Sequence, residues 1–421
     1  MTKPRTAALL IGLLILALYG RTLGYGLVWD DYAAFRARPL AALLGAWAGP
    51  WDPGGVWPNF YRPLSIALYA VLYQVFDHNT VGLHAMNLVE LFLAAWMLRA
   101  FVRRETDSNA LGLAAAMALV LHPETPSSLA AWISQQFHLV ELIAVVGAML
   151  VWQRVRHRRP AAWVWVLAPL TLGVLIKEDV LMIVPALLTW QLIRARFVRD
   201  VPVPSRQVVL LLGGWAAAYL VWRTVALGAI GGYGTPAAGR LLLNTVSGPL
   251  FTFGLQWIPS AHGLSLVAGA GVALLAGFAW VGRREATPRL TSLVLYGVTL
   301  GVFANVPLLL VSGHTRVHLM TLAAVMTLTA AAGIAAAGVT ARHGRVPLSA
   351  VAALLAWAIV VALANWTNTN TFAPCAAETL QRDADVLTWD VLTDTVRREL
   401  TAKMAACAQT GSEPFSTGFN R

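Results

Sequence analysis

Acidic, basic and hydroxyl-bearing side chains recur in the polar segments that separate the apolar stretches of this sequence. Two adjacent carboxylates, Asp30 and Asp31, come first. The later segments carry Tyr61 and Arg62, His122 and Glu124, Lys177 and Glu178 followed by Asp179, Arg223, and His314 with Arg316. A carboxylate can take the proton of a hydroxyl group, and cations can bind a phosphate and stabilise the charge that it gains as it leaves. Because ionisable groups at membrane depth are costly, their recurrence favours one shared site over isolated helix ends.

The composition indicates which elements must position these groups. Hydrophobic residues make up 58% of the 421 residues and charged residues 12%, roughly half the charged fraction of a soluble domain. Apolar runs that can cross about 30 Å of hydrocarbon recur along most of the chain. We therefore predict an all-α integral membrane protein with a bundle of about eleven transmembrane helices. The predicted spans are Ala7–Tyr25, Val81–Ala100, Ala110–Leu121, His138–Trp152, Ala161–Ile176, Val180–Ile193, Val208–Val225, Leu264–Val281, Leu290–Val311, Leu319–Val339 and Pro347–Ala364.

The distribution of charge predicts the orientation. Eighteen of the 31 Lys and Arg residues lie in six short segments between spans, with four acidic residues among them, so these segments sum to +14 and the rest of the chain to −3. Since cytoplasmic loops carry the excess of Lys and Arg, the N-terminus is predicted to be cytoplasmic and the C-terminus extracytoplasmic. The first apolar run is interpreted as a retained helix rather than a cleaved signal peptide. This distribution gives no support to nucleic-acid binding.

Two segments outside the spans are distinctive. Trp29–Thr80 is a long first external loop, within which the apolar stretch Pro63–Phe76 is predicted to lie at the membrane interface. The tail, residues 366–421, is polar and acidic and is predicted as a unit separate from the transmembrane domain of residues 1–365. It holds the two cysteines of the chain, Cys375 and Cys407. Their placement predicts a disulfide in an oxidising compartment, and the alternative is two unpaired thiols.

Geometry constrains the shape of this tail. A single helix over Ala376–Ala406, which contains no Gly or Pro, would be about 45 Å long. Its ends could not approach to the roughly 6 Å between Cα atoms that a disulfide requires. We therefore predict a disulfide-closed helical hairpin that reverses between Asp385 and Asp390, with Thr388 capping a second helix from Trp389. The hairpin is expected to lie over the external face, near the predicted site.

Seven short motifs follow one another over most of the first 320 residues. They are Leu23–Tyr32 (LGYGLVWDDY), Tyr61–Leu64 (YRPL), His84–Asn87 (HAMN), His122–Ser134 (HPETPSSLAAWIS), Lys177–Glu178 (KE), Arg223–Gly228 (RTVALG) and Arg316. In this order they resemble the motifs of GT-C superfamily membrane glycosyltransferases, especially the transmembrane and tetratricopeptide-repeat O-mannosyltransferases and their bacterial relatives. Two features depart from that pattern. Gln135-Gln136 replaces the Gly-Arg that often follows this WIS, and the tetratricopeptide repeats are absent.

The resemblance implies an inverting glycosyltransferase that moves a sugar from a polyprenyl-phosphate-linked donor to a hydroxyl acceptor on a protein, lipid or glycan. It implies that an acidic residue of the first external loop is the catalytic base. Asp31 is slightly favoured for this role, but the sequence does not separate it from Asp30. Lys177, Arg223 and Arg316 are candidates for binding the donor phosphate.

The remaining candidates complete the predicted substrate-binding set. Tyr61 and Arg62 are expected to position either substrate. The set also includes three residues at the membrane edge, namely His122, Glu124 and Glu178. No cofactor is predicted. A divalent metal held by Asp30, His122 and Glu124 is a lesser alternative, because these residues lack tight ligand spacing.

Two functions of other classes stay open. One is a transporter or flippase of a lipid-linked glycan, although broken helices and paired inverted halves, which are typical of transporters, are not visible in the sequence. The other is an inactive membrane scaffold. The glycosyltransferase interpretation places the protein in a bacterial inner membrane, in contact with membrane lipid and with its substrates on the extracytoplasmic side.

Overall fold

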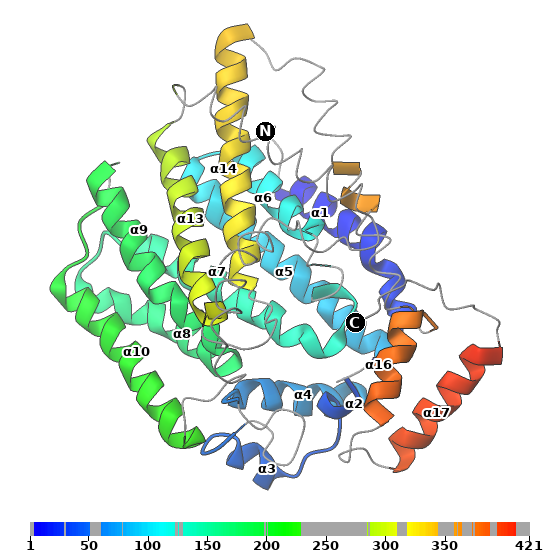
Figure 1. The fold of residues 1–421 in the computed structure, drawn as a ribbon. Helices are drawn as coiled ribbons and strands as arrows, with labels where there is room; N and C mark the ends of the chain where they lie inside the picture. Colours follow the sequence, from blue (N-terminus) through cyan, green and yellow to red (C-terminus); the bar gives the residue numbers. More distant parts are fainter. Residues whose placement is uncertain are drawn as a thin grey trace.

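The computed structural model describes residues 4–28, 31–50, 60–77, 79–122, 125, 129–197, 199, 201–228, 284, 287–309, 318–343, 358–359, 361–363, 373, 375–387 and 394–409. Within these ranges every regular element is helical (Figure 1). In the described part of the chain, five helical segments are long and apolar enough to cross a membrane, namely Pro4–Gly24, Thr80–Thr106, Ile133–Val155, Arg206–Leu227 and Thr321–Ala341. The chain is therefore an all-α membrane protein. Of the eleven predicted spans, Leu264–Val281 and most of Pro347–Ala364 lie outside the described residues.

The elements of the first half are α1 (Pro4–Tyr19), η1 (Gly20–Gly24), α2 (Asp31–Ala34), α3 (Leu40–Gly45), α4 (Pro63–Phe76), α5 (Thr80–Thr106), α6 (Asn109–Leu121), η3 (Ile133–Gln135), α7 (Gln136–Val155), η4 (Pro160–Trp163), α8 (Val164–Ile176) and η5 (Glu178–Met182). The later elements are α9 (Ile183–Phe197), α10 (Arg206–Leu227), α13 (Pro288–Leu309), α14 (His318–His343), α16 (Ala377–Leu387) and α17 (Asp394–Gln409). The predicted interfacial segment forms α4 with the expected bounds.

Side-chain caps determine where several of these helices begin. The side chains of Asn79, Ser108 and Ser205 accept hydrogen bonds from backbone N–H groups in the first turns of α5, α6 and α10. Such caps satisfy N–H groups that have no partner inside the helix. Gly228 ends α10 with a φ of +66°, a left-handed conformation that glycine adopts without steric cost.

The helix α5 lies in the middle of the bundle, packed against α1, α6, α7 and α13, while α13 runs along α14 and also contacts α9 (Figure 1). Aromatic side chains from three helices fill part of this core. The ring of Trp190 in α9 lies 4.3 Å from that of Trp152 in α7 and 4.3 Å from that of Tyr296 in α13, centroid to centroid. All three side chains are buried, so their contacts fix α7, α9 and α13 side by side.

Two polar clusters lie at opposite ends of α7. At its C-terminal end, Glu105 accepts hydrogen bonds from Arg156 and Arg194, which joins the ends of α5, α7 and α9. At its N-terminal end, Ser134 and Phe137 contact the candidate site described below. Because α7 has 20 residues, the two ends are about 30 Å apart. The basic segments near Arg156 and Arg194 therefore lie on one side of the bundle, and the candidate site lies on the other.

The tail forms the predicted disulfide. Cys375 and Cys407 are joined with their Cα atoms 5.3 Å apart, and α16 and α17 lie beside α2 at the edge of the bundle (Figure 1). The first part of the predicted reversal is helical instead. The first helix continues through Asp385 to Leu387, and the described part of the second helix is Asp394–Gln409. Trp389, where the second helix was predicted to begin, lies outside the described residues. Thr388 lies outside the described residues. Since Val386 is fully buried, burial of this apolar residue extends α16 into the predicted turn.

Candidate functional site

The first part of the site is the loop that joins η1 to α2. No helix is assigned over Tyr25–Val28, and Asp31 begins α2. The Asp31 carboxylate is fully buried. One of its oxygens accepts the N–H of Val28 at 2.9 Å, and the other accepts the N–H of Ser134 at 2.6 Å. Asp31 thus connects the LGYGLVWDDY motif to the end of the HPETPSSLAAWIS motif. The two bonded residues, Asp31 and Ser134, lie 103 positions apart in sequence.

The peptide groups of Ser134 are fixed by a second hydrogen bond besides the one from its N–H to Asp31. The hydroxyl of Tyr69 in α4 donates to the Ser134 carbonyl oxygen. The ring of Tyr69 lies 5.2 Å from that of Phe35 and 6.5 Å from that of Phe137, centroid to centroid. Tyr69 and Phe137 therefore connect the residues around Asp31 to Arg62 in the second part of the site.

The second part is centred on Arg62, which immediately precedes α4. Its Nε and Nη2 donate to the two carboxylate oxygens of Glu178 at 2.9 and 3.0 Å. The guanidinium carbon lies 4.3 Å from the ring centroid of Phe60 and 5.4 Å from that of Phe137. A bidentate pair of this kind fixes both side chains in orientation as well as in distance. It joins the YRPL motif to the KE motif.

Arg223 and Tyr61 complete this cluster from α10 and from the loop before α4. Arg223 is buried, and its charge acts on Glu178. Burial disfavours the Glu178 carboxylate, but Arg62, through its charge and hydrogen bonds, and then Arg223 outweigh this and lower the pKa of Glu178 to about 2. The Tyr61 hydroxyl donates to the Trp47 carbonyl oxygen at 3.0 Å and accepts from Nε1 of Trp222 at 2.6 Å.

The third part surrounds Lys177. Its ammonium lies 2.7 Å from an Asp179 carboxylate oxygen and 3.5 Å from one of Glu141, and Nδ1 of His138 lies 3.1 Å from the same Glu141 oxygen. Burial disfavours the charged lysine, but Asp179 and then Glu141 outweigh it and raise the pKa of Lys177. The side chains of Lys177 and Glu178 therefore belong to two different charged clusters, although the residues are adjacent in sequence.

The structure brings together most of the predicted site residues that it describes. Tyr61, Arg62, Glu178 and Arg223 form one cluster, which we call the Arg62 cluster. Lys177 lies next to the Arg62 cluster, close enough for the positive charge of Arg62 to act on its ammonium. His122 directly follows α6, and its side chain is buried. Asp30, Glu124 and Arg316 lie outside the described residues.

Two members of the site were not predicted as site residues. Glu141 and His138, both in α7, are not among the residues that the sequence predicts for the site. Their spacing of three residues on one helix was a usable signal, since it places both on one face of α7. Within the described ranges, no group of three or more His, Cys, Asp and Glu side chains is arranged to hold a metal ion.

No protein-family model and no curated protein sequence match this chain. Among solved structures, the chain is similar to the oligosaccharyltransferase of the archaeon Archaeoglobus fulgidus, crystallised with zinc and sulfate. That match has a TM-score of 0.55 and 14% identity, and it covers 98% of this chain and 59% of the archaeal one. A second structure, of the archaeal oligosaccharyltransferase AglB from the same organism with an inhibitory peptide and a dolichol-phosphate, matches with a TM-score of 0.48, 14% identity and coverages of 99% and 61%.

The first of these similarities establishes the fold. At 14% identity and a TM-score of 0.55, the first match shows that the chain shares the GT-C fold of a membrane glycosyltransferase. The chain spans about three fifths of the length of the archaeal structures. The resemblance to GT-C enzymes predicted from the motifs is confirmed at the level of the fold, while the nearer relationship to the O-mannosyltransferases stays a prediction.

Proposed function

We propose that this chain is an inverting glycosyltransferase that moves a sugar from a polyprenyl-phosphate-linked donor to a hydroxyl acceptor on the extracytoplasmic side of a bacterial inner membrane. One observation carries the proposal. Arg62, Glu178 and Arg223, from three sequence motifs, form one charged cluster at the same end of α7 as Asp31. This convergence occurs within a fold that is shared with a membrane oligosaccharyltransferase.

The charges of the Arg62 cluster suit a phosphate. Within the cluster, Arg62 and Arg223 supply two positive charges and Glu178 one negative charge, so these three side chains together are net positive. Because the pKa of Glu178 is about 2, this balance holds at neutral pH. The ammonium of Lys177 already lies between Asp179 and Glu141. We therefore assign the donor phosphate to Arg62 and Arg223, with Arg316 as a further candidate and Lys177 as a neighbour.

The transfer would be a single displacement. The acceptor oxygen attacks the anomeric carbon, its proton passes to a carboxylate, and the bond between that carbon and the phosphate oxygen breaks. The electron pair leaves with the polyprenyl phosphate, whose charge the guanidinium groups stabilise. A phosphate leaving group needs no general acid, so one carboxylate is sufficient. Attack from the face opposite the leaving group inverts the configuration.

The two acids of the first loop suit different roles. Both Asp31 oxygens accept backbone N–H groups, so Asp31 is suited to fixing the shape of the loop. The adjacent Asp30 is then our candidate for the base that takes the acceptor proton. This assignment reverses the slight preference for Asp31 that the sequence alone gave.

The test uses the full chain in lipid nanodiscs with polyprenyl-phosphate-linked hexoses and pentoses. Mass spectrometry should detect loss of the lipid-linked sugar and release of polyprenyl phosphate with the wild-type protein. An Asp30→Asn, Asp31→Asn double variant should bind the donor without releasing the sugar. Asp107→Asn, which changes an exposed acid at the opposite end of the bundle, should behave as the wild type. Donor binding by the wild type without release would favour a lipid-linked glycan transporter, and neither binding nor release would overturn the proposal.

A further inference from the structure

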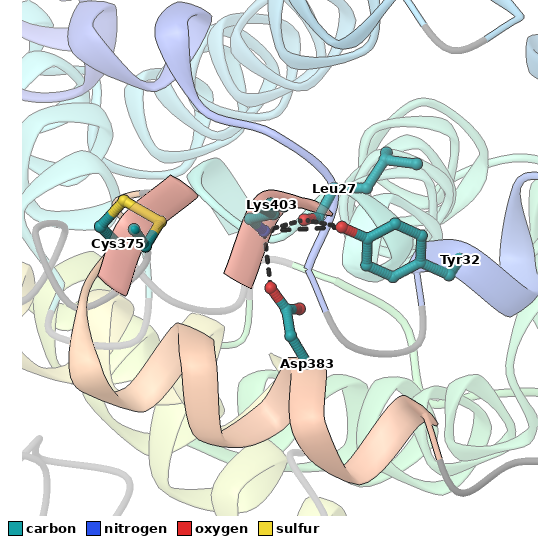
Figure 2. Close-up of a disulfide and its surroundings, with 6 residues drawn as sticks. Leu27, Tyr32, Cys375, Asp383 and Lys403 are labelled. Carbon is teal, nitrogen blue, oxygen red and sulfur yellow. Dashed lines mark hydrogen bonds and ion pairs between the residues drawn. A yellow bond between two sulfur atoms is a disulfide. The ribbon is translucent and has the colours of Figure 1, made fainter. Parts of the chain in front are cut away.

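The side chain of Lys403 in α17 joins the tail hairpin to the Asp31 loop. Its ammonium lies 2.6 Å from the Asp383 carboxylate, 3.0 Å from the carbonyl oxygen of Leu27 and 3.5 Å from the Tyr32 hydroxyl (Figure 2). A lysine ammonium has three donors, and each of them has an acceptor here. The side chain connects positions that are 376 residues apart.

Burial and charge hold the Lys403 side chain in one position. Asp383 is fully buried on α16, and the Lys403 side chain is 20% exposed. A buried carboxylate without a partner is costly, so Asp383 holds the ammonium in place. Val386 and Leu400 of the tail pack in the same apolar cluster as Leu27 and Tyr32. The hairpin therefore rests on the loop through apolar contact, with Lys403 as its polar link.

The acceptor of Lys403 belongs to the peptide group that holds Asp31. The Leu27 carbonyl and the Val28 N–H are parts of one planar peptide unit, in which the two bonds point in opposite directions. The carbonyl oxygen accepts Lys403 and, at 3.1 Å, the hydroxyl of Tyr32. The N–H donates to the Asp31 carboxylate at 2.9 Å. Any rotation of this peptide group would break the contacts on both sides together.

We propose that Lys403 is a positioning residue, which orients the Leu27–Val28 peptide group and, through it, the Asp31 carboxylate. The Cys375–Cys407 disulfide ties the end of α17 to the start of α16, four residues along the helix from Lys403. The tail is thus a component of the site rather than a separate appendage. The effect of Lys403 on sugar transfer rests on the proposed function, whereas its effect on the conformation of the Asp31 loop does not.

The first measurement is hydrogen exchange of the full chain in nanodiscs. Lys403→Met removes the ammonium and keeps an apolar stem, so exchange of the peptide that spans residues 25–32 should rise by about tenfold or more. The matched control is Arg398→Met, since Arg398 is an exposed cation of the same helix whose described bond is to the Asp394 carbonyl. It should leave that exchange unchanged. Unchanged exchange in Lys403→Met would overturn the proposal, whether or not the protein transfers sugar.

The second measurement separates positioning from general stability. Lys403→Met should lower kcat at least about fivefold with KM for the donor nearly unchanged, because the phosphate-binding residues stay in place. In an Asp31→Asn background the same substitution should have no further effect. An equal loss in both backgrounds would contradict action through Asp31. If the wild type transfers no sugar, the proposed function fails, and the exchange result alone decides whether Lys403 holds the loop.

A second variant covers the case in which Lys403→Met does not fold. Lys403→Gln keeps one amide donor but is too short to reach Asp383 and Leu27 together. It should raise exchange over residues 25–32 by about threefold, less than Lys403→Met. Exchange equal to that of the wild type, with the Cys375–Cys407 bridge intact by mass spectrometry, would again overturn the proposal.

Discussion

Arg62 and Glu178 form a bidentate ion pair across 116 positions of sequence, with N–O distances of 2.9 and 3.0 Å. The pair fixes the start of α4 against the start of η5. It also turns the guanidinium plane toward the rings of Phe60 and Phe137. Because the Arg62 side chain is 6% exposed and that of Glu178 25%, the pair is shielded from most of the screening that weakens surface ion pairs.

Arg62→Lys should weaken donor binding. Lysine retains the positive charge but replaces the planar guanidinium fork with a compact ammonium, which cannot reproduce the two parallel bonds to Glu178. We expect about tenfold lower affinity for a polyprenyl-phosphate sugar and a decrease of a few degrees in Tm in detergent. Native mass spectrometry and differential scanning fluorimetry measure the two effects. Arg104→Lys, at an exposed position of α5 on the opposite side, is the control, and an equal loss in both variants would contradict the prediction.

The stability that the Arg62–Glu178 pair provides should depend on pH only in acid. The pKa of Glu178 is lowered from 4.5 to about 2 in the folded protein. A lowered pKa stabilises the fold fully above the unfolded-state value, and this stability is lost as the pH falls through the folded-state value. The difference in Tm between wild type and Glu178→Gln should therefore be constant from pH 8 to about pH 5 and shrink below about pH 4.5. A difference that changes between pH 6 and pH 8 would show that another group controls the pair.

The acids of the first loop should control turnover. Asp30→Asn removes the proposed base at constant size, so turnover should fall by roughly 10²-fold or more while donor binding survives. Asp31→Asn presents an amide NH₂ to one of two backbone N–H donors. It should therefore lower turnover and also raise hydrogen exchange near Val28 and Ser134. Full activity in both single variants would end the base hypothesis.

The basic loops should be cytoplasmic. Cys375 and Cys407 are the only cysteines of the chain and are joined to each other, so an introduced cysteine reports on its own loop. Cysteines in place of Arg104, Arg158, Arg199, Arg284 or Arg345 should resist a membrane-impermeant thiol reagent in intact cells and react after permeabilisation. External labelling at two of these positions would rule out the predicted orientation.

The Cys375–Cys407 bridge should stabilise the tail. A disulfide that closes a loop of 32 residues restricts the unfolded chain, an effect worth about 3–4 kcal/mol in the chain-entropy model. The Cys375→Ser, Cys407→Ser variant should therefore show faster exchange over α16 and α17, while exchange in α5 and α7 stays unchanged. Mass spectrometry of protein isolated without reductant should find the two cysteine peptides linked. Two free thiols would contradict this expectation.

The sequence by itself determined the class of the protein and most helix positions. Apolar runs predicted α4 at Pro63–Phe76 and located α6 to within one residue of Asn109–Leu121. These features are local, because hydropathy, capping residues and turn residues act over a few positions of the chain. The two cysteines and the length of the segment between them were likewise sufficient to predict the disulfide, but not that α16 continues through Asp385 to Leu387.

Only the tertiary structure decided how the site residues are partnered. Lys177 and Glu178 are adjacent, yet the first faces Glu141 and Asp179 and the second faces Arg62. No local pattern distinguishes them, since the choice depends on which helices pack beside η5. Lys403 had no recognisable motif, and its role follows from a contact with Leu27 that lies 376 positions away. Contacts at such separations arise from the packing of the whole bundle, which the order of residues along the chain does not reveal.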